Sequence, residues 1–190
     1  MRKLLVLVDM DDTLCDTRGQ RIRDLRKISK DESEVNPDYL SPNCPPYVQE
    51  RLRLIMSQPG WWESLQKLED GFQLYELVKS EGFETQILSK APDTYDLALT
   101  EKKKWCNKNV PGSKVALVPE KFRYAGDILI DDWPDYVIPW LNTYPKGRAI
   151  LPLREWNKNC KDSRVIHYTG KNIKEVKIFL DQAKYLVNRV

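Results

Sequence analysis

Residues that bind zinc or form disulfides are scarce in this sequence. It has one histidine, His167, and four widely spaced cysteines, Cys15, Cys44, Cys106 and Cys160. No two cysteines stand in a C-x-x-C pair, so a zinc site of the Cys/His type is not expected. No secretory leader is recognisable, and scattered cysteines are then typical of free thiols in a reducing cytosol. We therefore expect a cytoplasmic protein.

Long hydrophobic runs and an excess of charge are also missing. The N-terminal run from Leu4 to Val8 is far shorter than the ~20 apolar residues of a membrane span. The 31 basic and 28 acidic residues leave a net charge of +3, which by itself does not indicate nucleic-acid binding. We expect no membrane contact and no stable nucleic-acid partner, and a homodimer stays open.

The chain does have enough apolar residues for a core, and they alternate between two patterns. Of its 190 residues, 41% are hydrophobic. Short apolar runs predict strands at 4–8, 84–89, 115–118, 128–130, 149–151 and 164–167. Amphipathic spacing predicts helices near 68–78, at 94–109 and at 173–187. This alternation favours an α/β fold with a three-layer, Rossmann-like parallel sheet. Apart from 149–151, residues 138–164 read as a loop-rich extension.

Residues 17–67 interrupt the alternation. A Thr17-x-x-Gln20 capping box is expected to open one helix, and a second presents Val48 and Leu52 on one face. We therefore predict an α/β core formed by 1–16 and 68–190, with a small helical cap, 17–67, inserted after the first strand.

Acidic residues follow two of the predicted strands directly. Asp9 and Asp11 come after the first strand, and Asp131 and Asp132 after the strand at 128–130. Ligands bind at the carboxyl ends of the strands in such sheets. Hard carboxylate oxygens in pairs suit Mg²⁺, which keeps waters and substrate phosphate as its other ligands. The alternative is that each aspartate forms a turn or caps a helix, which is our interpretation of Asp12 and Asp16 in the same stretch.

Four segments in order resemble the motifs of the haloacid dehalogenase-like phosphatases. DMDDT at 9–13 is similar to the first motif, DxDx[TV], and ILS at 87–89 to the second. Lys121 offers the third-motif lysine, and DILIDDWPD at 127–135 resembles the fourth motif, DxLIDDRPD, of the 5′(3′)-deoxyribonucleotidases. The resemblance covers roughly residues 1–16 and 70–136.

This resemblance implies a reaction and a metal. Asp9 would be the nucleophile that forms an aspartyl-phosphate, and Asp11 the general acid and base. Mg²⁺ would be held by the Asp9 carboxylate, the Asp11 backbone carbonyl and Asp132, with Asp131 second or bound through water. The substrate would be a small phosphate ester, most simply a nucleotide.

The phosphate contacts would come from a serine and several lysines. Ser89 would hydrogen-bond a phosphate oxygen, and Lys121 would neutralise the phosphoryl group and bridge to Asp9. Lys102 shares the apolar face of its predicted helix, and the family has a lysine there that reaches the phosphate; the alternative is a packed stem whose ammonium reaches water. Lys90 stands where the family has a hydroxyl residue, which changes a substrate contact to an ammonium.

Two further departures and one aromatic pair bear on the substrate. Asp12 stands where this branch usually has glycine, and Trp133 replaces the arginine of DDRPD. Trp61 and Trp62 resemble the paired aromatics that stack the base in the deoxyribonucleotidases. Core packing between cap and sheet is the alternative for both.

The sequence therefore predicts a Mg²⁺-dependent phosphomonoesterase that hydrolyses a (deoxy)nucleoside monophosphate. Within the same fold, a phosphatase for a non-nucleotide metabolite or a nucleic-acid terminal phosphate is the alternative. A binding module for phosphate or nucleotide without catalysis is a second one, although all the catalytic residue types are present together.

Overall fold

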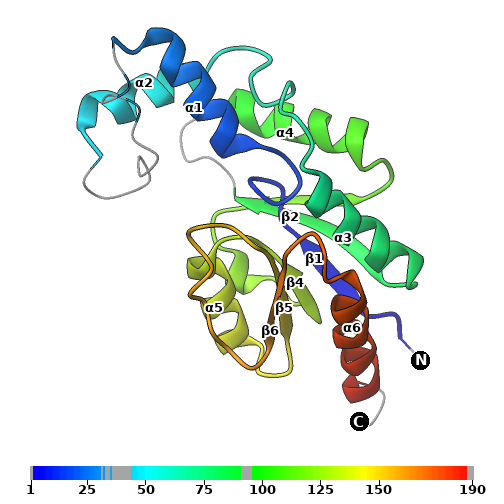
Figure 1. Ribbon diagram of the computed structural model, residues 1–190. Coiled ribbons are helices and arrows are strands. Elements are labelled where there is room, and N and C mark those ends of the chain that lie inside the picture. Colours follow the sequence, from blue (N-terminus) through cyan, green and yellow to red (C-terminus); the bar gives the residue numbers. More distant parts are fainter. Residues whose placement is uncertain (1, 31, 33–34, 36–43, 91–95, 188–190) are drawn as a thin grey trace.

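A six-stranded parallel sheet forms the centre of the computed structural model, which describes residues 2–30, 32, 35, 44–90 and 96–187. The strands run in the order β3-β2-β1-β4-β5-β6, and every neighbouring pair is parallel (Figure 1). Their bounds are β1 Leu5–Val8, β2 Glu84–Lys90, β3 Lys114–Val118, β4 Ile128–Ile130, β5 Arg148–Pro152 and β6 Val165–Tyr168. All six strands predicted from the sequence are present.

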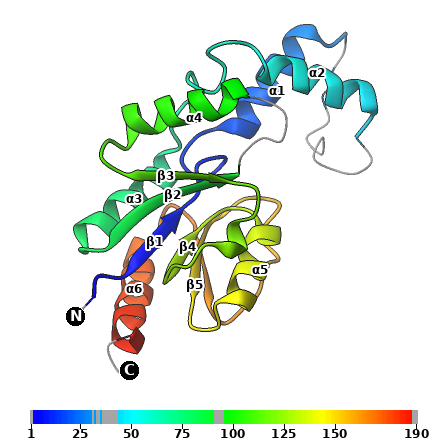
Figure 2. The ribbon, with the colours of Figure 1, turned by 180° about the vertical axis from the view of Figure 1, so that it is seen from behind.

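Helices cover both faces of this sheet (Figures 1 and 2). One face carries α3 (Glu69–Ser80), α4 (Asp96–Asn109) and α6 (Ile173–Val187), and the other carries α5 (Pro134–Thr143) with the short 3₁₀ helix η2 (Lys121–Arg123). The predicted three-layer α/β architecture is thus confirmed. Residues 94 and 95, included in the predicted helix at 94–109, lie outside the described residues.

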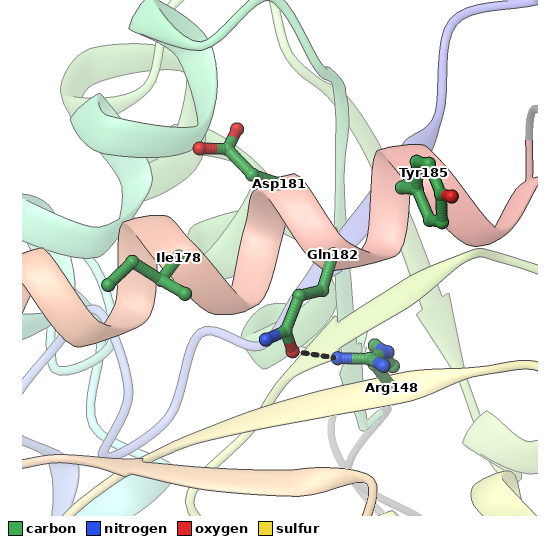
Figure 3. A pocket seen from close by; sticks show the side chains of 5 residues that line it. All are labelled: Arg148, Ile178, Asp181, Gln182 and Tyr185. Atoms are coloured by element: carbon green, nitrogen blue, oxygen red, sulfur yellow. Dashed lines mark hydrogen bonds between the residues drawn. The ribbon is translucent and has the colours of Figure 1, made fainter.

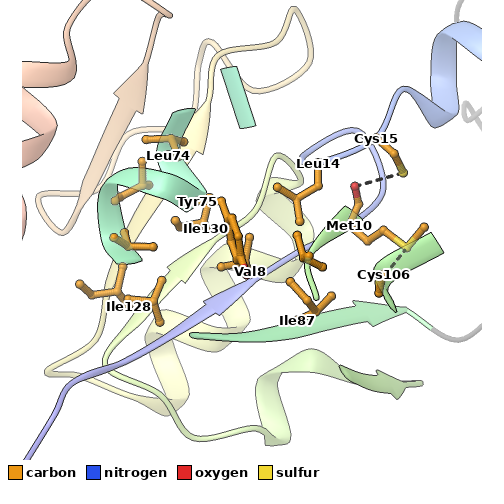
Figure 4. Close-up of a cluster of buried hydrophobic side chains, with 14 of the residues drawn as sticks. Val8, Met10, Leu14, Cys15, Leu74, Tyr75, Ile87, Cys106, Ile128 and Ile130 are labelled. Carbon is orange, nitrogen blue, oxygen red and sulfur yellow. Dashed lines mark hydrogen bonds between the residues drawn. The ribbon is translucent and has the colours of Figure 1, made fainter. Parts of the chain in front are cut away.

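The core is split between the two faces by the alternation of side chains along each strand. Val6, Val8 and Ile130 belong to the cluster beneath α3, α4 and α6. Figure 4 labels Val8 and Ile130 among the side chains of this cluster. Leu7 and Leu129, their neighbours in sequence, belong to the cluster beneath α5. Strands that are apolar on both faces are what a sheet covered on both sides requires.

The insertion after β1 contains two helices, α1 (Thr17–Ile28) and α2 (Pro46–Met56), which lie at the end of the sheet where β1 leads into α1 (Figure 1). They share a small cluster that includes Leu25, Val48 and Leu52. Trp61 and Trp62 instead belong to the main core cluster.

Two local expectations need correction. The first helix is capped by Asp16, whose carboxylate accepts from the Gly19 amide at 2.9 Å, and not by Thr17. The role of Asp16 as a helix-entry residue is confirmed. The segment 138–143, read as loop, is the second half of α5, which contains Pro139 and buries Trp140 and Leu141. None of the helices in the described part of the chain has the length and apolar character needed to cross a bilayer.

Candidate active site

The strand register brings the predicted site residues to one edge of the sheet. Val8 of β1 is paired with Ile130 of β4, so Asp9 and Asp131 both follow at the same level. The Asp9 amide donates to the Ile130 carbonyl at 2.8 Å, which fixes the two aspartates side by side. Ser89 lies near the end of β2 and is fully buried.

Lys121 holds two of the carboxylates from the start of η2. Its ammonium lies 2.6 Å from Asp9 Oδ1 and 2.7 Å from Asp131 Oδ2, and all three side chains are at most 4% exposed. The ammonium also lies 4.6 Å from the centre of the Tyr136 ring. Burial opposes the charge on Lys121, but the two carboxylates outweigh it and raise its pKa above its ordinary value.

A third carboxylate completes a group that could hold a metal ion. Ligand oxygens of Asp9, Asp131 and Asp132 lie within 4.8 Å of one another, and all three residues are buried. Burial raises the pKa of Asp9 to about 8. Lys121 acts to lower this pKa, whereas Asp131 and Asp11 raise it further. The pKa of Asp132 is also raised well above its usual range by burial and by the neighbouring aspartates. Burial and like charge together thus favour the neutral forms of these carboxyl groups until a cation binds.

Asp11 is held apart from this group by a second lysine. Lys102, 1% exposed on α4, pairs with Asp11 Oδ2, and Ser89 donates to the same oxygen at 3.1 Å. Thr17, at the first position of α1, donates to Asp11 Oδ1 at 3.1 Å. Burial raises the pKa of Asp11, but the Lys102 ammonium outweighs this, and the net pKa lies below its ordinary value.

The loop that carries Asp9 and Asp11 has a constrained backbone. Asp12 adopts φ +55°, a left-handed conformation that glycine reaches easily and aspartate tolerates better than most residues. This explains why glycine is usual here, and the interpretation of Asp12 as a turn residue is confirmed. Arg154 Nε and Nη2 donate to the Asp12 carbonyl at 3.2 and 3.1 Å. A Cβ on Gly71 of α3 would lie 1.8 Å from the Thr13 carbonyl oxygen, so only glycine allows this close approach.

Both carboxylate oxygens of Asp132 are bonded by neutral donors. Thr13 donates to Oδ1 at 3.1 Å, and the indole Nε1 of Trp156 donates to Oδ2 at 2.9 Å. The Asn157 amide group donates to the Asp132 carbonyl at 2.9 Å and to the Pro152 carbonyl at 2.8 Å. The loop after β5 is therefore tied directly to the end of β4.

Trp61 and Trp62 are buried, at 7% and 3% exposure, and their rings meet edge to face at 4.8 Å. The Lys102 ammonium lies 4.5 Å from the centre of the Trp62 ring, so this indole adjoins the lysine that pairs with Asp11. Glu101 accepts from the Gly60 amide at 2.6 Å and from the Trp62 amide at 3.1 Å. By these contacts Trp61 and Trp62 are packed as core residues, which was the alternative to base stacking.

The chain matches the model of one known protein family. The model of the family described as 5′ nucleotidase, deoxy (pyrimidine), cytosolic type C protein matches residues 2–176. The chain belongs to this 5′-nucleotidase family. It is a phosphoric monoester hydrolase of the haloacid dehalogenase-like type, and the resemblance inferred from its motifs is confirmed.

Solved structures of haloacid dehalogenase-like hydrolases share the fold of this nucleotidase. One from Bacillus subtilis, bound to magnesium, has a TM-score of 0.58 at 12% identity, covering 94% of this chain and 99% of that one. One from Deinococcus radiodurans, with bound phosphate and sodium, has a TM-score of 0.56 at 14% identity, with coverages of 95% and 96%. One from Xanthomonas campestris has 0.55 at 11%, with 97% and 100%. No curated protein matches the chain.

Several residues of the nucleotidase site are not apparent from its motifs. Trp156 bonds Asp132, Arg154 bonds the Asp12 carbonyl, and Glu101 bonds the amides of Gly60 and Trp62, all from outside the four motifs. Glu101 matches the family's Glu-Lys pair, and Trp156 is one of the aromatics of the loop-rich extension, but no local pattern marks Arg154. Thr17, which the sequence places in a capping box, instead bonds the Asp11 carboxylate. The Lys90 carbonyl accepts from Lys102 at 3.0 Å, while a phosphate contact of the Lys90 ammonium stays a prediction.

A surface pocket lies elsewhere, between α6 and β5 (Figure 3). It is lined by Arg148, Ile178, Asp181, Gln182 and Tyr185. Arg148 is the first residue of β5, so this pocket lies at the edge of the sheet opposite Asp131. Its position separates it from the nucleotidase chemistry.

Proposed function

We propose that this nucleotidase hydrolyses a (deoxy)nucleoside monophosphate with Mg²⁺, through an aspartyl-phosphate on Asp9. The observation that carries the proposal is the group of three buried carboxylates beside Lys121 at the carboxyl ends of β1 and β4. We also propose that the protein is cytoplasmic and that residues 17–67 form a separate cap.

The donor set fits Mg²⁺. Carboxylate oxygens are its preferred protein ligands, and like charges crowded in a buried site are stabilised by a divalent cation. Asp132 is the better direct ligand of the fourth-motif pair. Asp131 Oδ2 is paired with the Lys121 ammonium at 2.7 Å, whereas the hydrogen bonds that Asp132 accepts from Thr13 and Trp156 come from neutral groups and leave its negative charge for a cation to balance. When bound, the metal would offset the charge of the anionic nucleophile and phosphate.

The protein residues divide the reaction between them. A carboxylate oxygen of Asp9 attacks phosphorus as the ester P–O bond breaks, and Asp11 gives a proton to the leaving oxygen. Water then attacks the phosphorus of the aspartyl-phosphate, loses its proton to Asp11 and releases Asp9 and inorganic phosphate. Asp11 starts ionised next to Lys102. If the Lys102 ammonium moved from Asp11 to a phosphate oxygen of the substrate, the pKa of Asp11 would rise. Asp11 could then take up from solvent the proton that it must donate to the leaving oxygen.

The substrate's phosphate would be bound by Ser89, Lys102 and Lys121, with Lys90 at the rim. Stacking of its base on Trp61 and Trp62 stays part of the proposal because Trp62 lies next to Lys102, but both indoles are buried, so a ring face must first become accessible. The family description names deoxy pyrimidine nucleotides, and we extend that preference to this chain.

The experiment is a phosphate-release assay on deoxy- and ribonucleoside monophosphates, sugar phosphates and p-nitrophenyl phosphate. We expect turnover with Mg²⁺, none with EDTA or in Asp9→Asn, and a preference for a nucleotide. A wild type no more active than Asp9→Asn would refute catalysis. A preference for sugar phosphates would leave the phosphatase and refute the nucleotide. A Trp61→Ala/Trp62→Ala double variant that discriminates between bases like the wild type would refute the stacking.

A further inference from the structure

Trp156 lies at a point where three separate parts of the chain meet. It belongs to the loop between β5 and β6 and is half-buried. Its indole N–H bonds Asp132 after β4, its ring lies 4.7 Å from the guanidinium carbon of Arg18 on α1, and its centroid is 6.3 Å from that of Trp133. The side chain thus has a hydrogen bond at its indole N–H and contacts of its ring with Arg18 and Trp133.

The loop backbone around Trp156 is fixed just as firmly. The next residue, Asn157, is fully buried and donates to the carbonyls of Asp132 and Pro152. His167 of β6 is 3.0 Å from the Asn157 carbonyl oxygen. These bonds tie the loop to the end of β4 and fix the position of the indole N–H relative to the Asp132 carboxylate.

The chemistry of this hydrogen bond suits a metal ligand. A neutral N–H orients a carboxylate without neutralising it, whereas the Lys121 ammonium neutralises Asp131. An ionised carboxylate has about four lone-pair sites, so the bonds from Thr13 and Trp156 leave both oxygens of Asp132 able to bind a cation. Groups that hold a metal ligand in this way tune the affinity of the site.

We propose that Trp156 is a positioning residue that orients Asp132 for Mg²⁺ through its indole N–H. This rests on the proposed function, because it requires Asp132 to ligate the metal. The site that the motifs define ends at 127–135, so the proposal adds to it a residue from the β5–β6 loop.

The test compares Trp156→Phe with Trp133→Phe. The first removes the N–H donor and keeps an aromatic ring; the second changes the neighbouring indole without removing a bond to Asp132. Mn²⁺ binding to each folded variant is measured by electron paramagnetic resonance, and phosphatase activity is titrated with Mg²⁺. We expect Trp156→Phe to bind Mn²⁺ about 10-fold more weakly or worse, within the 10- to 100-fold range typical of such partners. Its half-saturating Mg²⁺ should rise in parallel, with most of kcat recovered at saturation.

The outcomes separate the two proposals. Wild-type affinity in Trp156→Phe would overturn the positioning role and leave the metal site standing. An equal loss in both variants would also overturn it, since the ring and not the N–H would matter. Wild-type protein that binds no Mn²⁺ would refute the metal site itself. If Trp156→Phe fails to fold, ¹⁵N-indole spectra of the wild type decide: on addition of Mg²⁺, the Trp156 signal should shift more than those of Trp105 and Trp140, and an equal or smaller shift would refute the role.

Discussion

Replacement of Lys121 by methionine offers a direct measure of the electrostatics of this site. The ammonium is 2% exposed and lies within 2.7 Å of both Asp9 and Asp131, which are themselves 4% and 0% exposed. Lys121→Met preserves much of the side-chain volume but leaves two buried carboxylates without their cation. Loss of one partner of a buried ion pair destabilises a protein by about 3–5 kcal/mol. For a chain of this size, that corresponds to a fall in Tm of roughly 6–20 °C.

The loss should depend on pH in a defined direction. Without Lys121, the pKa values of Asp9 and Asp131 rise further above those of the unfolded chain, so the folded variant binds more protons than the unfolded one. Its stability then falls as pH rises, because the carboxylates must ionise without a partner. We therefore expect the deficit relative to wild type to be smaller at pH 6 than at pH 8.

The assay is thermal unfolding followed by circular dichroism, in EDTA so that no metal replaces the lysine. Lys103→Met, on the exposed side of α4, is the control for removing a charge. Asp131→Asn and its combination with Lys121→Met complete a double-mutant cycle, in which the second change should recover part of the loss. A Lys121→Met variant as stable as Lys103→Met, or a deficit that shrinks at high pH, would refute the reasoning.

Three further outcomes follow from other contacts. Gly71→Ala should lower the denaturant midpoint and impair activity, because its Cβ would collide with the Thr13 carbonyl oxygen; an unchanged midpoint contradicts this. Glu101→Ala should lower the free energy of unfolding in urea by about 1–3 kcal/mol, because the buried amide of Trp62 loses its acceptor. A change in that free energy smaller than the error of the fit counts against this. In the native protein, iodoacetamide should modify half-buried Cys160 before Cys106, whose burial raises its pKa to about 12, as peptide mapping would show.

The sheet and its catalytic edge could be predicted because each strand carries its own signal. Segments such as 4–8 and 128–130 are apolar on both faces, and only a covered parallel sheet buries both. Once the strands are placed, parallel pairing brings their carboxyl ends together, so Asp9 and Asp131 meet without any further information. The α5 helix was missed in part because Pro139 inside it argues against a helix by the usual rules.

The contacts that hold the site in place were not predictable in the same way. Trp156 and Arg154 lie in a loop without periodicity, and the Thr13–Asp132 bond joins residues 119 apart in sequence. A one-dimensional pattern describes which face of an element is buried, but such bonds depend on how separate loops cross. Asp12 is a further example. The sequence shows that an aspartate stands where glycine is usual, but only the structure shows that its backbone is left-handed.

The charges of the site fit the divalent cation that we propose to bind there. Four carboxylates and two ammonium groups meet at this edge of the sheet: Asp9, Asp11, Asp131 and Asp132, with Lys121 and Lys102. When all six groups are ionised, their net charge is −2, which one Mg²⁺ would balance. A third lysine would supply part of this but would leave no open position for a phosphate oxygen, whereas Mg²⁺ keeps such positions. Burial, with the neighbouring Asp131 and Asp11, raises the pKa of Asp9 in the metal-free protein, so binding of the cation and ionisation of Asp9 should be coupled.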